Sequence, residues 1–292
     1  MDSDQDNNHQ EETRLKIYFL PNLVTAGNLF CGFVALTKIV EVDLNSDGYH
    51  RVVQHAIFFI LLACIFDLLD GRVARIGGFE SPFGREFDSL ADIVSFGVAP
   101  AFLVHRIVLR DAFVMHPQVG WFIASIYLIC GALRLARFNC LASEAEITGR
   151  NTSKDFVGFP IPMAAGLVAS LTLFLLWWEQ QGLSIGVWRY GLPVILLFLS
   201  IMMVSEVKYP AFNSINWKTK RSFTKMVIVI LLIGFFVVAW EVIFPTVLPT
   251  LFTGYLIYGF IRPRISKRLR QRIEEELEDE DEDEQEISGT RG

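Results

Sequence analysis

Residues 52–75 have the sequence VVQHAIFFILLACIFDLLDGRVAR, a mostly apolar stretch that ends in two aspartates and two arginines. A helix that crosses a membrane needs about 20 predominantly apolar residues. Residues 52–73 meet that length, so we expect a spanning helix that carries Asp67 and Asp70 at one end.

Similar apolar stretches recur along the whole chain, which is 52% hydrophobic and has a mean hydropathy of +0.40. Soluble domains are less apolar and more highly charged. The sequence therefore predicts an all-α, polytopic membrane helix bundle with six core spans and eight in total. The expected spans are 17–39, 52–73, 87–109, 119–138, 161–178, 188–206, 224–243 and 246–261.

Polar residues are concentrated at the two ends of the chain. We expect residues 1–16 to form a polar, disordered N-terminal tail. Residues 17–261 would form one membrane catalytic domain. Residues 262–292 would form a cytoplasmic tail that is first basic and then acidic, whose basic half can meet anionic lipid headgroups.

Basic residues indicate the orientation, because cytoplasmic loops of membrane proteins are rich in Lys and Arg. With eight spans, most basic residues fall on the side of the two termini. Both termini and the aspartates would then face the cytoplasm, and a bacterial inner membrane is the simplest location. We expect membrane lipids, and no nucleic acid, as partners.

Four aspartates follow helical spacing on two neighbouring segments. Asp67 and Asp70 are three residues apart and lie on one face of the second span. Gly84, Asp88 and Asp92 are spaced by four and form one stripe on the third. A short cytoplasmic loop between the two helices would bring the four carboxylates together near the inner membrane face.

Carboxylates in this position are costly, at about 2.5–3.5 kcal/mol for each aspartate at mid-membrane. Like charges at short range repel one another as well. One or two such aspartates could form a hydrogen-bonded pair between helices or part of an ion path. Four together favour a site for Mg²⁺ or Mn²⁺, whose coordination substrate phosphates would complete.

Neighbouring residues suit a nucleotide-binding surface. Gly71 leaves the helix without a side chain, so that a nucleotide can approach its backbone, and Ala74 keeps the same face small. Gly84 does the same for the third helix. Arg75 can pair with a phosphate, and Ser81 before a proline is typical of a helix N-cap.

The complete pattern, DxxDGxxARx₈GxxxDxxxD over residues 67–92, is similar to the CDP-alcohol phosphotransferase family at every fixed position. The resemblance implies that Asp67, Asp70 and Asp88 hold a two-metal centre. It implies that Asp92 is a further ligand and the general base. Gly71, Arg75 and Ser81 would contact the CDP group.

The same resemblance implies a reaction and an assembly. An acceptor hydroxyl, deprotonated by Asp92, would attack the lipid-linked phosphoryl group of a CDP-lipid, and CMP would leave. Family members are usually homodimers. Two metals that clamp an in-line displacement agree with the clustering of the carboxylates.

Less stringent segments bear on the acceptor alcohol. They resemble the membrane-embedded phosphatidylserine synthases, which implies CDP-diacylglycerol as donor and L-serine as acceptor. These segments are PNLVTAGN (21–28), DSLADIVSFGVAP (88–100), GALRLARFN (131–139) and FPIP (159–162).

Arg134 and Arg137 are three apart at the cytoplasmic end of the fourth span, so either could hold the serine carboxylate, with help from Asn139. Alternatively, the arginines anchor the helix to lipid headgroups. Asn22, Thr25 and Asn28 share a face of the first span, where nucleotide contacts and helix packing are both possible.

Two other functions fit parts of the sequence. An enzyme of the same chemistry could use another acceptor and make phosphatidylglycerol phosphate, phosphatidylinositol phosphate or archaetidylserine. A transporter could use the aspartates as an ion site, but it predicts charges spread over several spans and an internal repeat. The acidic residues within the spans instead lie at two adjacent helix ends.

Overall fold

The computed structural model describes residues 19–46, 48–77, 81–148, 156–182, 186, 190–209 and 245–259. Almost all of the elements in these ranges are helices, and one pair of two-residue strands accompanies them. The long helices are α1 (Phe19–Glu41), α2 (Tyr49–Gly77), α3 (Pro82–Asp92), α6 (Pro117–Thr148), α7 (Ile161–Gln180) and α8 (Gly191–Val204). Between α3 and α6 lie η1 (Ile93–Val98), α4 (Ala99–Val104), η2 (His105–Leu109) and α5 (Arg110–Ala112), and the strands are β1 (Phe156–Val157) and β2 (Lys208–Tyr209).

The predicted polytopic helix bundle is confirmed. Within the described ranges, five segments are long and apolar enough to cross a membrane, and α8 is a shorter apolar helix. A helix over residues 245–259, which begins at a proline, stands where the last span was expected. The expected span 224–243 and the two tails lie outside the described residues.

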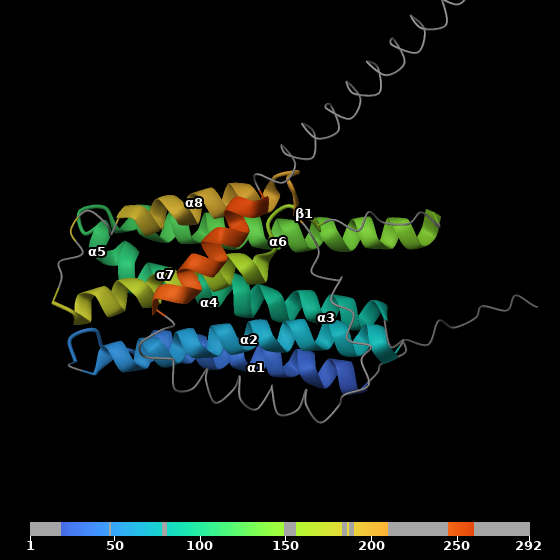
Figure 1. Ribbon diagram of the computed structural model, residues 1–292, viewed down its shortest axis with the longest axis horizontal. Coiled ribbons are helices and arrows are strands. Elements are labelled where there is room, and N and C mark those ends of the chain that lie inside the picture. The colour runs from blue at the N-terminus through green and yellow to red at the C-terminus, as the bar shows by residue number, and fades with distance from the viewer. Residues whose placement is uncertain are drawn as a thin grey trace, which may run out of the picture.

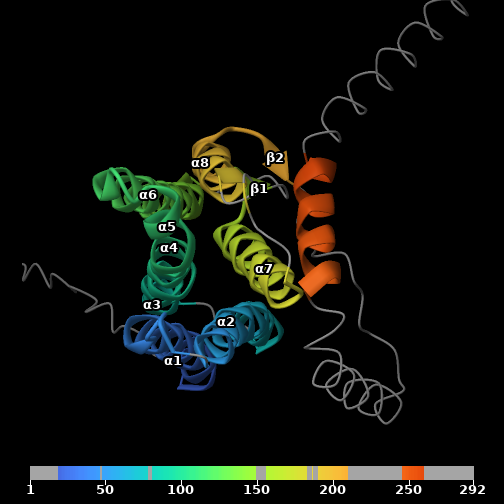
Figure 2. The same ribbon diagram turned by 90° about the vertical axis from the view of Figure 1, so that its left-hand side faces the viewer.

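The helices pack side by side, with α7 in the middle of the bundle. α1 packs along α2, and α6 packs along α8 (Figures 1 and 2). In the end-on view of Figure 2, α7 lies between α2 and α8, and helix 245–259 lies beside α7. The C-terminal end of α2 and the start of α3 meet at the same end of the bundle (Figure 1), so the topology alone brings the two aspartate-bearing segments together.

The third membrane segment, Pro82–Ala112, contains two π-helical stretches. Pro100 has no amide hydrogen, so it cannot bond the carbonyl of Phe96 four residues earlier. The Tyr127 hydroxyl of α6 donates to that carbonyl at 3.1 Å, while Ala99 bonds Val94 with the wider π spacing. The side chain of α6 thus replaces the backbone bond that the proline removes.

Candidate active site

The loop between α2 and α3 ends in a capped helix start. Ser81 has an extended backbone, and its hydroxyl accepts a hydrogen bond from the Gly84 amide at 3.1 Å. Pro82 is the first helical residue. This confirms the predicted N-cap, which fixes where α3 begins and therefore where its aspartates lie.

The aspartates of the two helices converge. Asp67 and Asp70 on α2 and Asp88 on α3 each offer a carboxylate oxygen, and these oxygens lie within 4.8 Å of one another. Asp70 is buried, with 5% of its surface exposed, and Asp92 is buried one turn further along α3. All four aspartates line one cavity.

This arrangement suits a divalent cation. Asp70 Oδ2 and Asp88 Oδ1 are buried and accept no hydrogen bond from the described residues. Buried acceptors without partners are costly, and clustered carboxylates repel one another where the dielectric constant is low. A hard cation such as Mg²⁺ or Mn²⁺ would satisfy these oxygens and remove the repulsion. The residues present therefore fit such a metal centre.

The shared cavity has a volume of about 470 Å³. One part of its wall is polar and contains the aspartates, whereas the rest is apolar and comes from α2, α6, α7 and helix 245–259. This combination suits a ligand with a charged head and a hydrocarbon tail. The apolar lining includes Leu61, Ile65, Leu68, Phe138, Met163, Leu248 and Phe252.

Two of the three predicted acceptor-binding residues lie in this wall. Arg134 lines the cavity with 7% of its surface exposed, and its Nε is buried without a hydrogen-bond partner among the described residues. Asn139 also lines the cavity, and its Nδ2 donates to the Ser89 hydroxyl at 2.9 Å. A buried guanidinium beside the carboxylates is a ready partner for an anionic group.

The third predicted residue, Arg137, has a different environment. Its Nη1 donates to the Val204 carbonyl at 2.9 Å and its Nη2 to the Ser205 carbonyl at 3.3 Å. Cations that bond the last carbonyls of a helix stabilise its C-terminus. Arg137 therefore ties α6 to the end of α8, and it is not among the residues that line the cavity.

The predicted nucleotide-binding residues are only partly brought together. Gly71 lines the cavity. Gly84 faces α1 instead, because a Cβ there would lie 3.5 Å from Asn22 Oδ1 and 3.2 Å from the Ser81 hydroxyl. Ala74 and Arg75 belong to the last turn of α2, and their side chains lie outside the described residues.

Several site residues were not predicted from the sequence. Arg85 and Ser89 line the cavity three residues before Asp88 and Asp92, and the three-residue helical spacing would have found them. Tyr255 lines it from helix 245–259, and no local pattern links that helix to the aspartates. Asn28 was expected to make nucleotide or helix-packing contacts, and its Nδ2 donates to Asp92 Oδ1 at 3.1 Å.

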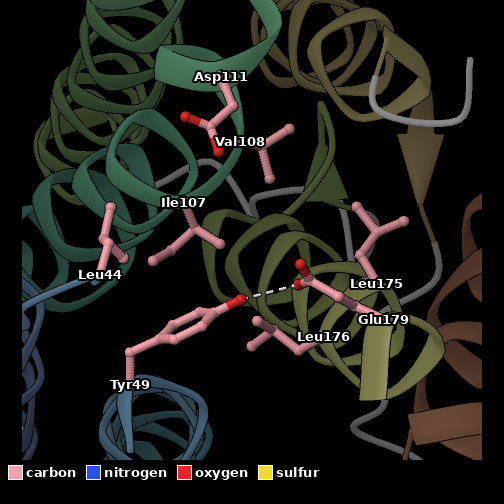
Figure 3. A pocket seen from close by; sticks show the side chains of 8 residues that line it. All are labelled: Leu44, Tyr49, Ile107, Val108, Asp111, Leu175, Leu176 and Glu179. Carbon is pink, nitrogen blue, oxygen red and sulfur yellow. Dashed lines mark hydrogen bonds between the residues drawn. The ribbon is translucent and has the colours of Figure 1, made fainter. Parts of the chain in front are cut away.

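A second, smaller cavity of about 140 Å³ lies between the start of α2 and the end of α7. Figure 3 shows Tyr49 reaching across it, where its hydroxyl donates to Glu179 Oε2 at 2.9 Å. Asp111 also lines it. None of its lining residues has a buried polar atom without a partner. The hydrogen bond joins α2 to α7, and we assign this cavity to packing.

The chain matches known proteins along most of its length. A family model described as CDP-alcohol phosphatidyltransferase matches residues 18–205. The chain is 33% identical to CDP-diacylglycerol–serine O-phosphatidyltransferase of Helicobacter pylori strain J99, over 84% of this chain and 91% of that protein. It is 32% identical to the Bacillus subtilis protein of the same name, over 67% of this chain and 92% of the relative. Archaetidylserine synthase of Methanothermobacter thermautotrophicus is 31% identical over 68% of this chain and 73% of its own length. The match spans the helices that carry all four aspartates, and the chain belongs to the CDP-alcohol phosphatidyltransferase family.

Proposed function

We propose that the chain is a phosphatidylserine synthase, which transfers the phosphatidyl group of CDP-diacylglycerol to the hydroxyl of L-serine and releases CMP. The observation that carries the proposal is one cavity that holds four aspartates, a buried arginine and an apolar wall. The relatives named above differ in lipid backbone, yet their names have serine in common. This favours serine over glycerol 3-phosphate or an inositol phosphate as acceptor.

The four aspartates would hold the metal ions. Asp67, Asp70 and Asp88 supply the closest group of oxygens, and Asp92 would be a further ligand. When bound, two Mg²⁺ or Mn²⁺ ions would neutralise the phosphate charge and stabilise the oxygens of an in-line displacement.

The donor would lie between α2 and α3. Gly71 leaves room in the cavity wall for the CDP group, and Ala74 and Arg75 follow it on the same helix. Ser81 and Gly84 would shape the loop and the first turn of α3 around this group. The apolar wall would receive the first part of the acyl chains.

Asp92 would act as the general base. It would take the proton from the serine hydroxyl, whose oxygen then attacks the phosphorus of the phosphatidyl group. A new phosphorus–oxygen bond to serine forms, the bond to the CMP oxygen breaks, and CMP leaves with the electron pair. The proton remains on Asp92 until it passes to solvent or to the leaving group.

Arg134 would hold the serine carboxylate, because a guanidinium fork matches a carboxylate and this one is buried beside Asp92. Asn139 would assist from the next turn of α6. Arg137 would orient this end of α6 through its bonds to the end of α8.

We place the site and both termini on the cytoplasmic side of a bacterial inner membrane, since basic residues are concentrated at that end. Residues 17–261 would form the catalytic domain, flanked by tails 1–16 and 262–292. The family resemblance supports a homodimer in contact with membrane lipids.

Purified protein in detergent tests the proposal. CDP-diacylglycerol would be supplied with L-serine, glycerol 3-phosphate or inositol phosphate, each with and without Mg²⁺ or Mn²⁺. We expect CMP release and a phosphatidylserine product only with serine and metal. Release with glycerol 3-phosphate but not with serine would overturn the acceptor assignment and leave the family chemistry intact.

A further inference from the structure

Asn28 is a buried polar residue in the middle of α1 that the reaction above does not use. Its side chain is completely buried, and its Nδ2 donates to Asp92 Oδ1 at 3.1 Å. An amide buried without hydrogen bonds is costly in an apolar environment. The bond to Asp92 is the only one that its amide group forms with the described residues.

The side-chain oxygen of Asn28 supports a role for the residue in bonding Asp92. Asn28 Oδ1 is buried and has no donor among the described residues. An apolar side chain of similar size would avoid the cost of that unpaired oxygen. Packing alone would favour an apolar residue such as leucine. We therefore attribute the presence of Asn28 to the hydrogen bond that it donates to Asp92.

Asn28 is itself held by the opposite helix. The Ser95 hydroxyl donates to the backbone carbonyl of Asn28 at 3.0 Å. Gly32 makes this approach possible, since a Cβ at that position would lie 2.7 Å from Ser95 Cα. Asp92 ends α3 and Ser95 belongs to η1, so contacts on both sides of the α3–η1 junction hold Asn28, one through its backbone and one through its side-chain amide.

The bond constrains Asp92 in a specific way. It occupies one carboxylate oxygen from the α1 side, and Asp92 also lines the cavity. Because the amide is neutral, it orients the carboxylate and leaves its negative charge in place. An arginine or lysine at this position would neutralise that charge.

We infer that Asn28 is a positioning residue of the transfer reaction, which holds one oxygen of Asp92 so that the other faces the acceptor hydroxyl. This inference rests on the proposed role of Asp92 as base. Groups that orient a functional side chain typically contribute 10–100-fold when they are removed, as they do around metal ligands.

The test compares Asn28→Leu, which keeps the branched shape of the side chain and replaces its two polar atoms by methyl groups, with Tyr127→Phe. The control also removes a buried hydrogen bond to the third membrane segment, the one that Tyr127 donates to the Phe96 carbonyl, but Tyr127 does not line the cavity. For each variant, kcat, the KM values for serine and CDP-diacylglycerol, binding of CDP-diacylglycerol and the melting temperature would be measured.

We expect Asn28→Leu to lower kcat by about 10–100-fold, with CDP-diacylglycerol binding within about threefold of the wild type. Tyr127→Phe should lower the melting temperature and keep kcat within about threefold. A folded Asn28→Leu protein with unchanged kcat would overturn the inference. Equal losses of kcat and of lipid binding in the two variants would overturn it too, because they would indicate general loosening of the bundle.

Two further variants complete the experiment. Asp92→Asn is measured in parallel. If this variant retains turnover, Asp92 is not the base. If it is inactive while Asn28→Leu is fully active, only the role of Asn28 is refuted. Should Asn28→Leu not fold, Asn28→Ala is judged by the same criteria, since a smaller side chain avoids overpacking.

Discussion

At the scale of single residues, Asp92 differs from the other three aspartates in its surroundings. Asp67, Asp70 and Asp88 face one another, whereas Asp92 is bonded to a neutral amide from α1. This difference supports separate roles, with three residues mainly as metal ligands and one also as base.

Replacing Asp92 by asparagine should remove the proton acceptor and retain most of the metal ligands. We expect CMP release to fall by about 10²–10⁴-fold, the usual contribution of a general base. Binding of CDP-diacylglycerol should be largely preserved. Turnover near that of the wild type would rule out Asp92 as the base.

The two arginines of α6 should respond differently to the same change. Arg134→Lys keeps the charge and loses the fork that fits a carboxylate, so we expect the KM for serine to rise about tenfold, equivalent to about 1.4 kcal/mol. Arg137→Lys should lower the melting temperature and change the KM for serine by less than about threefold. Steady-state kinetics with varied serine distinguishes the two, and equal KM changes would contradict the assignment.

Sequence spacing predicted that the aspartates come together, because residues three or four apart in a helix share a face whatever surrounds them. The roles of Arg134 and Arg137 could not be separated in this way. They lie on the same helix end, and only the packing of α8 against α6 gives Arg137 two backbone carbonyls as partners. Asn28 was placed on the correct face, but its partner is 64 residues away.

At the scale of elements, the contact between α1 and η1 depends on Gly32. Gly32→Ala would place a methyl group against the Ser95 side chain and 2.7 Å from its Cα. We expect a loss of about 1–3 kcal/mol in the free energy of unfolding, the usual cost of overpacking. Turnover should fall as well, since Asp92 and Asn28 would move apart.

Gly191→Ala is the matched control, because nothing lies within 4 Å of a Cβ at that helical position. It should leave stability unchanged or raise it slightly, as alanine favours a helix over glycine. Thermal unfolding in detergent and CMP release measure both effects. A Gly32→Ala protein as stable and active as the control would contradict the close approach.

The helices themselves follow from apolar length, which is a local property of the sequence. The π-helical stretches do not. Pro100 indicates that one backbone bond is missing, but the wider turn also requires the Tyr127 hydroxyl from another helix to satisfy the Phe96 carbonyl. Packing between helices therefore decides the form of the third membrane segment.

At the scale of the whole molecule, the metal centre would join two helices that otherwise repel each other. We expect chelation by EDTA to abolish activity and to lower the melting temperature. With Mg²⁺ at 100 times its dissociation constant, binding contributes about 2.7 kcal/mol of stability. Asp67→Ala should lose this metal-dependent shift together with its activity, and a normal Mg²⁺ response in that variant would count against the site.

The cavity is also a property of the whole molecule. Its apolar wall includes Leu248, Phe252 and Tyr255, which follow the segment matched by the family model. Phe252 packs where a Cβ of Gly166 would otherwise lie, so helix 245–259 is closely fitted to α7. Sequence patterns predicted this helix, but they could not predict that its side chains line the site.

The π turns of the third membrane segment make the number of its residues as important as their identity. Each residue of an α-helix turns the chain by about 100°. The bonds of a π turn join residues five apart, so the turn holds one residue more than an α-helical turn. Deleting one residue within Ile93–Val98 would therefore restore regular α-helical winding and leave the following side chains close to their present phase relative to Asp88 and Asp92. Along this stretch the chain should therefore accept a single deletion more readily than within Pro82–Asp92, where each residue removed rotates the rest of the segment by about 100°. A catalogue of tolerated length changes would map the junction without any assay of chemistry.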